Sequence, residues 1–324
     1  MKNFCLKTIF AAAALALASF GSARADGFAS ASGAGTFDSP YSGALTNISF
    51  SGFSSSDTVY ISGVSGFLEN EHGNYLCNID IGSGGFTINN GFSNNDAIYT
   101  FAGDISGSGN WTASSGTVRY AFVFTGDLSN YSGNLSVGTT NNNYPSYIHF
   151  GENTVAATDT DVSGTGAISC AATVKYDYFG YAADAAALTV GNTSISAARV
   201  EFSGGVNYTV DSDLAGKNAS GNALAISNSG TTVLNGVVSG FGDISVASGS
   251  TLVLNGEIAL TSAIANSGTV VVGSDAVFAL DNLSYAGNFV MGATYELIQG
   301  GVSLKALRSL PQTFPAHNLA ITSI

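Results

Sequence analysis

The sequence predicts an all-β solenoid, a parallel β-helix, over most of its 324 residues. Three observations predict this fold. Short runs of Val, Ile, Leu, Phe and Tyr alternate with polar residues, as in half-buried strands. Turn-forming residues separate the runs, and the chain contains 41 Gly but only 4 Pro. Similar segments recur about every 20 residues, a period typical of solenoids. Helical periodicity is almost absent.

The clearest repeat lies in the C-terminal third of the chain. Ser229-Gly230-Thr231 recurs as Ser248-Gly249-Ser250 and as Ser267-Gly268-Thr269, 19 residues apart each time. Leu234-Asn235-Gly236 recurs 20 residues later as Leu254-Asn255-Gly256. A unit of this length holds two or three strands but no helix-containing repeat. Stacked units supply a core that one unit cannot form alone, and Asn, Ser and Thr at equivalent positions are expected to form ladders.

A longer repeat lies upstream. The segment from Phe101 to Gly107 resembles the segment from Phe124 to Asn130, and a Ser-Gly-Asn step follows each of them. The offset predicts the same coil with longer turns. Between residues 139 and 224 the alternation continues with more irregular loops. Strands are expected there at Ser146 to Phe150, Ile168 to Val174, Arg199 to Phe202 and Asn207 to Val210.

Residues 1–25 predict a secretory signal peptide. A basic start with Lys2 and Lys7 precedes an apolar stretch from Ile9 to Phe20, and a small-x-small site ends at Ala25. The apolar stretch is short for a bilayer span, which needs about 20 residues. We expect cleavage after Ala25 and export to the cell surface, the extracellular medium or the periplasm, with a membrane anchor as the alternative. No later segment predicts a transmembrane helix.

Removing the signal peptide makes the chain more acidic. Six basic residues then face 22 acidic ones, a net charge of −16. Nucleic-acid affinity depends mainly on Lys and Arg contacts to phosphate, so this charge excludes a nucleic-acid partner. The same charge disfavours anionic lipid surfaces.

Two cysteines, Cys77 and Cys170, remain after cleavage. An even pair in an exported chain is compatible with a disulfide. Because a bridge requires Cα atoms within about 7 Å, the sequence leaves a disulfide and two separate buried thiols both open.

The sequence divides into four segments: a signal peptide at 1–25, an N-terminal β cap with the first coils at 26–90, β-helix repeats at 91–300, and a C-terminal segment at 301–324. In the last segment, Leu304, Leu307 and Leu310 recur every third position, and Pro311 and Pro315 interrupt any strand. This pattern predicts a short helical or irregular cap, since a terminal repeat must hide its strand edges. A truncated end is the equal alternative.

The repeats resemble a known family. The Phe-x-Gly-Asp-(Ile/Leu)-Ser pattern at Phe101 and Phe124, with the pattern from Asn228 to Gly256, is similar to the β-strand repeats associated with autotransporter passengers. The resemblance covers roughly residues 90–300 through short motifs. It implies a right-handed parallel β-helix at or released from the outer membrane, commonly an adhesin whose partner is a host or matrix glycan or protein.

One feature departs from that family. A complete autotransporter ends in a translocator barrel. Even a small barrel of eight strands needs about 9 to 11 residues for each strand. Only 23 residues follow Gly301. We therefore expect no translocator barrel in this chain, and an association with a separate outer-membrane component.

Metal and cofactor sites are not predicted. The three histidines, His72, His149 and His317, are scattered, and no zinc-type spacing of His or Cys occurs. A cluster of His72 with Glu69 and Glu71 is more simply a solvated turn. The Asp-x-Asp pairs are Asp159 with Asp161 and Asp211 with Asp213. Calcium needs six or more oxygen ligands, so aspartates bonded within turns explain these pairs better.

Catalytic residues are not predicted either. No Gly-x-Ser-x-Gly elbow occurs, and the Gly-x-Gly fragments do not precede helices. The carboxylates are spread among turns, and the basic residues along the solenoid body are Arg119, Lys175, Arg199 and Lys217. The sequence therefore predicts a non-enzymatic adhesin or structural protein. A carbohydrate-active β-helix is the competing class, which a groove with several carboxylates and a basic residue would favour.

Aromatic residues gather at one place. Tyr176, Tyr178, Phe179 and Tyr181 are the candidate ligand contacts, because aromatic rings flanked by polar groups stack on sugars or contact proteins. In an alternating strand, Tyr176 and Tyr178 share one face, and Phe179 and Tyr181 share the other. An aromatic stack inside or alongside the solenoid is the favoured alternative.

Overall fold

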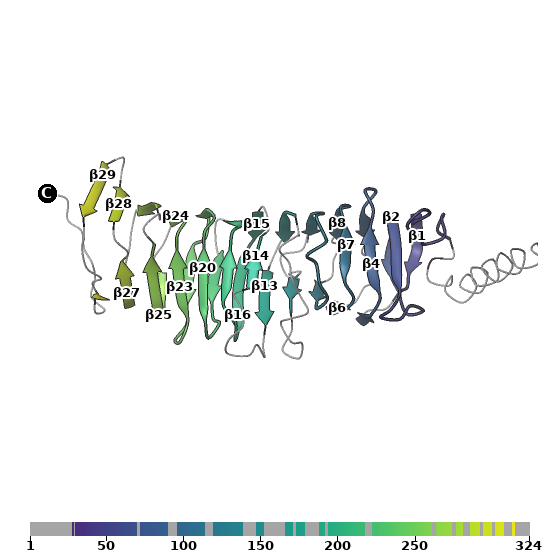
Figure 1. The fold of residues 1–324 in the computed structure, drawn as a ribbon, viewed down its shortest axis with the longest axis horizontal. Helices are drawn as coiled ribbons and strands as arrows, with labels where there is room; N and C mark the ends of the chain where they lie inside the picture. The colour runs from purple at the N-terminus through teal and green to yellow at the C-terminus, as the bar shows by residue number, and fades with distance from the viewer. Residues whose placement is uncertain are drawn as a thin grey trace, which may run out of the picture.

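The computed structural model describes residue 28 and residues 30–69, 72–89, 96–113, 119–138, 147–151, 166–170, 173–178, 188–191, 194–217, 222–260, 264–273, 277–280, 286–291, 294–299, 302–307 and 313–314. The segment predicted as a signal peptide lies outside these residues. The described part contains 30 strands and no α-helix, and therefore no helix that could span a membrane. Strands of successive coils lie side by side along an elongated molecule (Figure 1), and they form two 15-stranded sheets.

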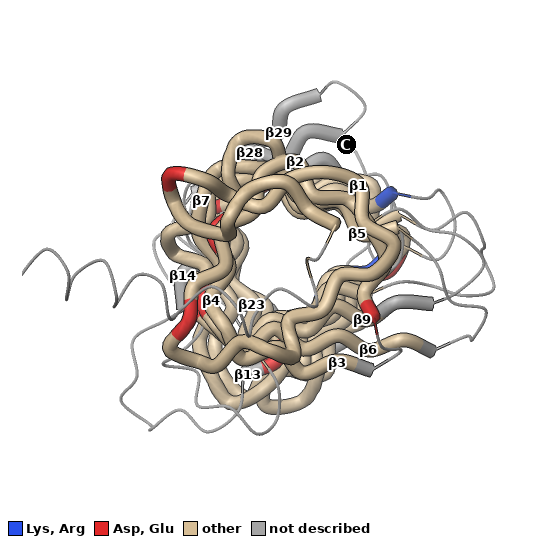
Figure 2. The backbone as a smooth tube through the Cα atoms, turned by 90° about the vertical axis from the view of Figure 1, so that its right-hand side faces the viewer, with Lys and Arg blue, Asp and Glu red and all other residues tan. Residues whose placement is uncertain are grey.

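Each regular coil visits three sides in the same order, here named A, B and C, around one axis (Figure 2). Side A contains β4 (Asn78–Ile81), β7 (Ile105–Gly107), β14 (Leu188–Val190), β17 (Tyr208–Val210), β20 (Thr231–Leu234) and β23 (Thr251–Leu254). Side B contains β5 (Phe86–Ile88), β8 (Trp111–Ala113), β10 (Leu135–Val137), β12 (Ile168–Cys170), β15 (Ser194–Ala197), β18 (Asp213–Gly216), β21 (Val238–Ser239), β24 (Glu257–Leu260), β26 (Val277–Leu280) and β28 (Thr294–Gln299). Side C contains β3 (His72–Tyr75), β6 (Asp96–Phe101), β9 (Arg119–Phe124), β11 (Tyr147–Phe150), β13 (Thr173–Tyr178), β16 (Arg199–Gly204), β19 (Ala223–Ile226) and β22 (Asp243–Val246).

Longer strands join these sides. β1 (Tyr41–Ile48) pairs with β2 (Thr58–Leu68), and β2 pairs with β4 through its first half and with β5 through its second. β25 (Ile264–Val272) likewise pairs with β22 and then with β23. All of these pairs are parallel, so the predicted parallel β-helix is confirmed.

Alternating side chains on each strand point inward and form one apolar core. On side C, five aromatic rings from successive coils stack along the axis: Phe101, Phe124, Phe150, Tyr176 and Phe202. Their neighbouring centroids are 5.5, 5.7, 5.0 and 5.1 Å apart. Offset pairs of this kind add about 0.5–1.5 kcal/mol each beyond the burial of apolar area.

The predicted polar ladders are confirmed at the corners of the coils. Asn255 Nδ2 donates to Asn235 Oδ1 (2.9 Å), and Asn235 Nδ2 donates to Asp211 Oδ1 (2.7 Å). Upstream, the backbone N–H of Asn134 donates to Asn110 Oδ1 (3.2 Å). These bonds explain why the Leu-Asn-Gly and Ser-Gly-Asn motifs recur.

The register corrects the 19-residue spacing. Thr231 pairs with Thr251, and Thr251 pairs with Thr269, so the two steps are 20 and 18 residues. The first and third Ser-Gly turns are therefore at equivalent positions, and the middle turn is offset from them by one residue. Leu234 pairs with Leu254, because the buried leucines and the asparagine ladder beside them determine the register.

The C-terminal segment differs from the expected cap. β29 (Val302–Leu307), which contains Leu304 and Leu307, is a strand and pairs antiparallel with β28. β30 (Thr313–Phe314) pairs antiparallel with β27 (Ala286–Met291). The prediction of a helical or irregular segment is wrong for these residues, because the exposed strand edges of the last coil are paired with more strand instead.

Candidate functional site

The outer surface of side C carries the main charged cluster of the described residues. β11, β13 and β16 pair in register with steps of 26 residues, as in Tyr147, Thr173 and Arg199. Alternation then places the next outward residues side by side in a second row, which is His149, Lys175 and Glu201. The inward residues between these rows belong to the buried core. Three neighbouring strands therefore present polar and charged side chains at equivalent positions.

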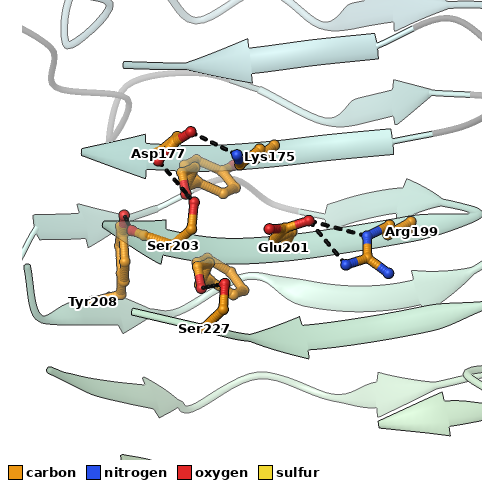
Figure 3. Close-up of polar contacts among 9 residues, drawn as sticks. Lys175, Asp177, Arg199, Glu201, Ser203, Tyr208 and Ser227 are labelled. Atoms are coloured by element: carbon orange, nitrogen blue, oxygen red, sulfur yellow. Dashed lines mark hydrogen bonds and ion pairs between the residues drawn. The ribbon is translucent and has the colours of Figure 1, made fainter. Parts of the chain in front are cut away.

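Two ion pairs lie within this surface (Figure 3). Lys175 Nζ lies 2.6 Å from Asp177 Oδ2. Arg199 donates to Glu201 Oε2 through Nη2 at 3.0 Å and through Nε at 3.1 Å. Ser203 Oγ donates to Asp177 Oδ1 (2.9 Å), which links β16 to β13.

Because Lys175 pairs with Glu201 across the strands, the charges alternate from Asp177 through Lys175 and Glu201 to Arg199. We refer to these four residues and His149 as the charge cluster. The exposed fractions of the side chains are 25% for Lys175, 12% for Asp177, 44% for Arg199 and 19% for Glu201. The two carboxylates are thus more buried than the two cations that pair with them.

His149 is the neutral edge of the cluster. Burial lowers the pKa of its imidazole, and the neighbouring Lys175 lowers it further, whereas Asp177 and Glu201 act in the opposite direction. The ring of Tyr147 lies edge-on to the ring of His149, with centroids 5.6 Å apart. The cluster therefore has an aromatic border on the β11 side.

Small side chains bound the cluster along the axis. In β9, Ala121 and Val123 occupy the two outward rows next to Tyr147 and His149. In β19, Ala223 and Ala225 occupy the same rows next to Arg199 and Glu201. The charged residues therefore form a separate island three strands wide.

The aromatic prediction is wrong for Tyr176. Its side chain is 0% exposed and stacks between Phe150 and Phe202 inside the solenoid. Burial raises the pKa of its hydroxyl, and Tyr208 adds to this effect. The favoured alternative, an internal aromatic stack, is confirmed at this residue, since β13 turns Tyr176 inward and Lys175 outward. The side chain of Tyr178, and all of Phe179 and Tyr181, lie outside the described residues.

The two cysteines do not form a disulfide. Both Cys77 and Cys170 are buried, and neither is bonded to another cysteine. Cys77 precedes β4 and β5, whereas Cys170 lies in β12, three strand steps further along side B. At about 4.8 Å per step the separation is about 14 Å, beyond the reach of a bridge. Burial also raises the pKa of the Cys77 thiol to about 12, so this thiol is unreactive at neutral pH.

The Asp-x-Asp pair at the corner between β17 on side A and β18 on side B takes part in ladders. Asp211 accepts a hydrogen bond from Asn235, and Asp213 Oδ1 accepts one from the backbone N–H of Val237 (2.8 Å). Within the described part of the chain, no three His, Cys, Asp or Glu residues are grouped so that they could hold a metal ion. Asp159, Asp161 and His317 lie outside it, as do the side chains of His72 and Arg119.

Sequence reasoning placed Asp177 on the same strand face as Lys175, but it missed His149 and Glu201 as neighbours on the adjoining strands. Lys217 lies apart from this group, and its Nζ donates to Ser169 Oγ on side B (2.6 Å). A signal was present: Tyr-Ile-His-Phe, Thr-Val-Lys-Tyr and Arg-Val-Glu-Phe recur every 26 residues from Tyr147. The common features are the apolar second residue and the aromatic fourth residue, with a variable polar residue between them.

Comparisons with protein-family models, with curated proteins and with solved structures find no match to this chain.

Proposed function

We propose that this chain is an exported, non-enzymatic β-helix protein of the cell surface that acts as an adhesin or a structural passenger. The observation that carries the proposal is the continuous parallel solenoid. A stack of coils exposes long lateral faces, and repeat proteins commonly use such faces for binding. The basic and apolar pattern of residues 1–25 and the resemblance of the repeats to autotransporter passengers support the same function.

The chemistry of the described surface also supports a binding role. The ladders at the corners are made of Asn and Asp side chains that bond to neighbouring coils. Asp177 and Glu201 are each held by a cation on the same strand. These contacts hold the polar groups in fixed positions on the surface, and the net charge of −13 favours solubility of a repetitive β protein.

Export and display are tested in cells. We expect a tagged chain to be recovered at the surface or in the medium after loss of residues 1–25, and to be cleaved by protease added to intact cells. A matched chain with Lys2 and Lys7 replaced by Glu should remain inside the cell, because a signal peptide needs its basic start. Recovery of the unmodified chain only in the cytoplasm would contradict the proposal.

A carbohydrate-active β-helix is the second candidate function. The charge cluster favours it, since two carboxylates and two cations meet on one face, and glycoside hydrolysis uses paired carboxylates. Incubation of the purified chain with polysaccharides, followed by measurement of new reducing ends, separates the two candidates. Adhesion predicts none, whereas an enzyme predicts release that is abolished in Asp177→Asn and Glu201→Gln.

A further inference from the structure

The solenoid does not need the charge cluster in order to stack. The flanking coils carry alanine and valine at the same positions, and the more exposed of the two ion pairs, Arg199 with Glu201, is of a kind that contributes about 0–1 kcal/mol. The solenoid therefore continues on both sides of the cluster without such residues. The concentration of charged residues on three strands therefore indicates a role other than folding.

The cluster presents hydrogen-bond donors and acceptors in alternation. The Arg199 guanidinium has five N–H donors and the Lys175 ammonium has three. Their pairs with Glu201 and Asp177 use two donors and one donor, respectively. The carboxylates have about four acceptor positions each. Neighbouring strands lie about 4.8 Å apart, close to the length of one sugar unit along a glycan chain.

The border of the cluster adds an aromatic surface. The rings of Tyr147 and His149 are half-buried and lie beside the polar groups. Aromatic rings offer an apolar face together with a polar edge. This combination suits sugar rings, which carry C–H groups on their faces and hydroxyls at their edges.

We propose that the charge cluster and Tyr147 form a binding site for an uncharged polysaccharide that runs along the solenoid axis across β11, β13 and β16. The site deepens the proposed adhesive function and rests on it. Tyr147 and His149 contact a sugar face, while Arg199 and Lys175 donate to hydroxyl oxygens and Glu201 and Asp177 accept from hydroxyl groups.

The charge balance selects an uncharged glycan. The cluster contains two cations and two anions, so it offers no net attraction to an acidic polymer. The chain as a whole carries a net charge of −13 and repels polyanions over long range. A ligand whose hydroxyl groups both donate and accept matches the alternating arrangement without a charge of its own.

The test exchanges the partners of one ion pair. In the double variant Arg199→Glu with Glu201→Arg, the pair persists in reverse order, but the donor and the acceptor exchange places. Glu201→Gln serves as a second variant of nearly unchanged shape. Glu257→Gln is the control, because Glu257 is exposed in β24 on side B. Binding of each purified chain is measured by affinity electrophoresis in mannan, β-glucan and hydroxyethyl cellulose, with alginate as the acidic polymer.

We expect the unmodified chain and Glu257→Gln to be retarded equally by at least one neutral polymer. The exchanged pair and Glu201→Gln should each weaken this binding by about tenfold, the effect of losing a charged hydrogen bond, with unchanged melting temperatures. Retardation by alginate alone, by no neutral polymer, or equally in the exchanged variant would overturn the site. Such a failure leaves export and display intact, whereas a cytoplasmic chain that still binds glycan would refute only the proposed location.

Discussion

At the scale of single residues, His149 couples the charge cluster to pH. It pairs with Val123 in β9 and with Lys175 in β13, and Asp177 and Glu201 are the nearby carboxylates. Burial and Lys175 lower its pKa below the ordinary value of about 6.5. A base with a lowered pKa in the folded state binds protons more readily in the unfolded chain. The contribution of neutral His149 to the free energy of unfolding is therefore complete above about pH 6.5, and this contribution is lost as the pH falls through the folded-state pKa of His149.

This pH dependence is tested with His149→Gln. We expect the melting temperature of the unmodified chain to fall more between pH 7.5 and pH 5 than that of the variant, because glutamine takes up no proton. All other residues are the same in both proteins, so the difference between the two reports the effect of His149. Parallel melting curves over this range would show that His149 does not contribute.

A second residue-scale prediction concerns Gly126 of the Phe-x-Gly-Asp motif. A Cβ at this position would overlap the carbonyl oxygen of Gly103 in the preceding coil. Backbone of two coils would have to separate, so Gly126→Ala should destabilise by about 1–3 kcal/mol, as overpacking does. Gly52→Ala is the control, since a Cβ there meets nothing within 4 Å, and it should be neutral or stabilising by up to about 1 kcal/mol. Denaturant unfolding measures both, and equal effects would contradict the steric explanation.

At the scale of elements, the aromatic ladder of side C holds neighbouring coils together. Phe150 is buried and stacks on Phe124 and Tyr176. Phe150→Ala should lower the free energy of unfolding by about 3–5 kcal/mol, because it leaves a cavity between two rings. The control is Phe37→Ala: Phe37 is 76% exposed and has an edge contact with Tyr60, so the loss should stay below about 1 kcal/mol. A similar loss in both variants would show that the aromatic ladder does not contribute to the free energy of unfolding beyond an exposed ring contact.

The strands were predictable where the alternation is strict. The strand predicted from Arg199 to Phe202 begins where β16 begins, and the strand predicted from Asn207 to Val210 ends where β17 ends. The sequence predicts one strand from Ile168 to Val174, whereas the chain passes from β12 on side B to β13 on side C within that range. Both strands have the same alternation of apolar residues, so the pattern alone does not reveal the corner between them.

The charge cluster was less predictable than the strands. Equivalent residues on its three strands are separated by 26 positions along the chain, and only the pairing of β11, β13 and β16 brings them together. The position of Tyr176 could not be predicted from its local sequence either. Its neighbours suggest an exposed aromatic patch, but the register places it in line with Phe150 and Phe202 in the core.

At the scale of the whole molecule, the solenoid tolerates coils of very different length. Leu135 pairs with Ile168, 33 positions later, whereas Ile195 pairs with Leu214, 19 positions later. Longer connections between strands add little loop-closure free energy, and each strand restarts the inward and outward alternation. The fold class therefore follows from local patterns, while the coil length does not, and a single repeat period describes only part of the chain.

Stacked coils also determine how damage spreads through the molecule. In a repeat protein, stability is approximately a sum of terms for each repeat and for its nearest neighbours. Phe150→Ala should therefore reduce amide hydrogen-exchange protection most in β11, then in β9 and β13, which pair directly with it. The effect should fade toward β2 and β23, which lie several coils away. Exchange measured by mass spectrometry on peptides from each strand resolves this gradient. A uniform loss of protection from β2 to β23 would instead mean that the described coils unfold as one cooperative unit, with long-range coupling that nearest-neighbour stacking does not supply.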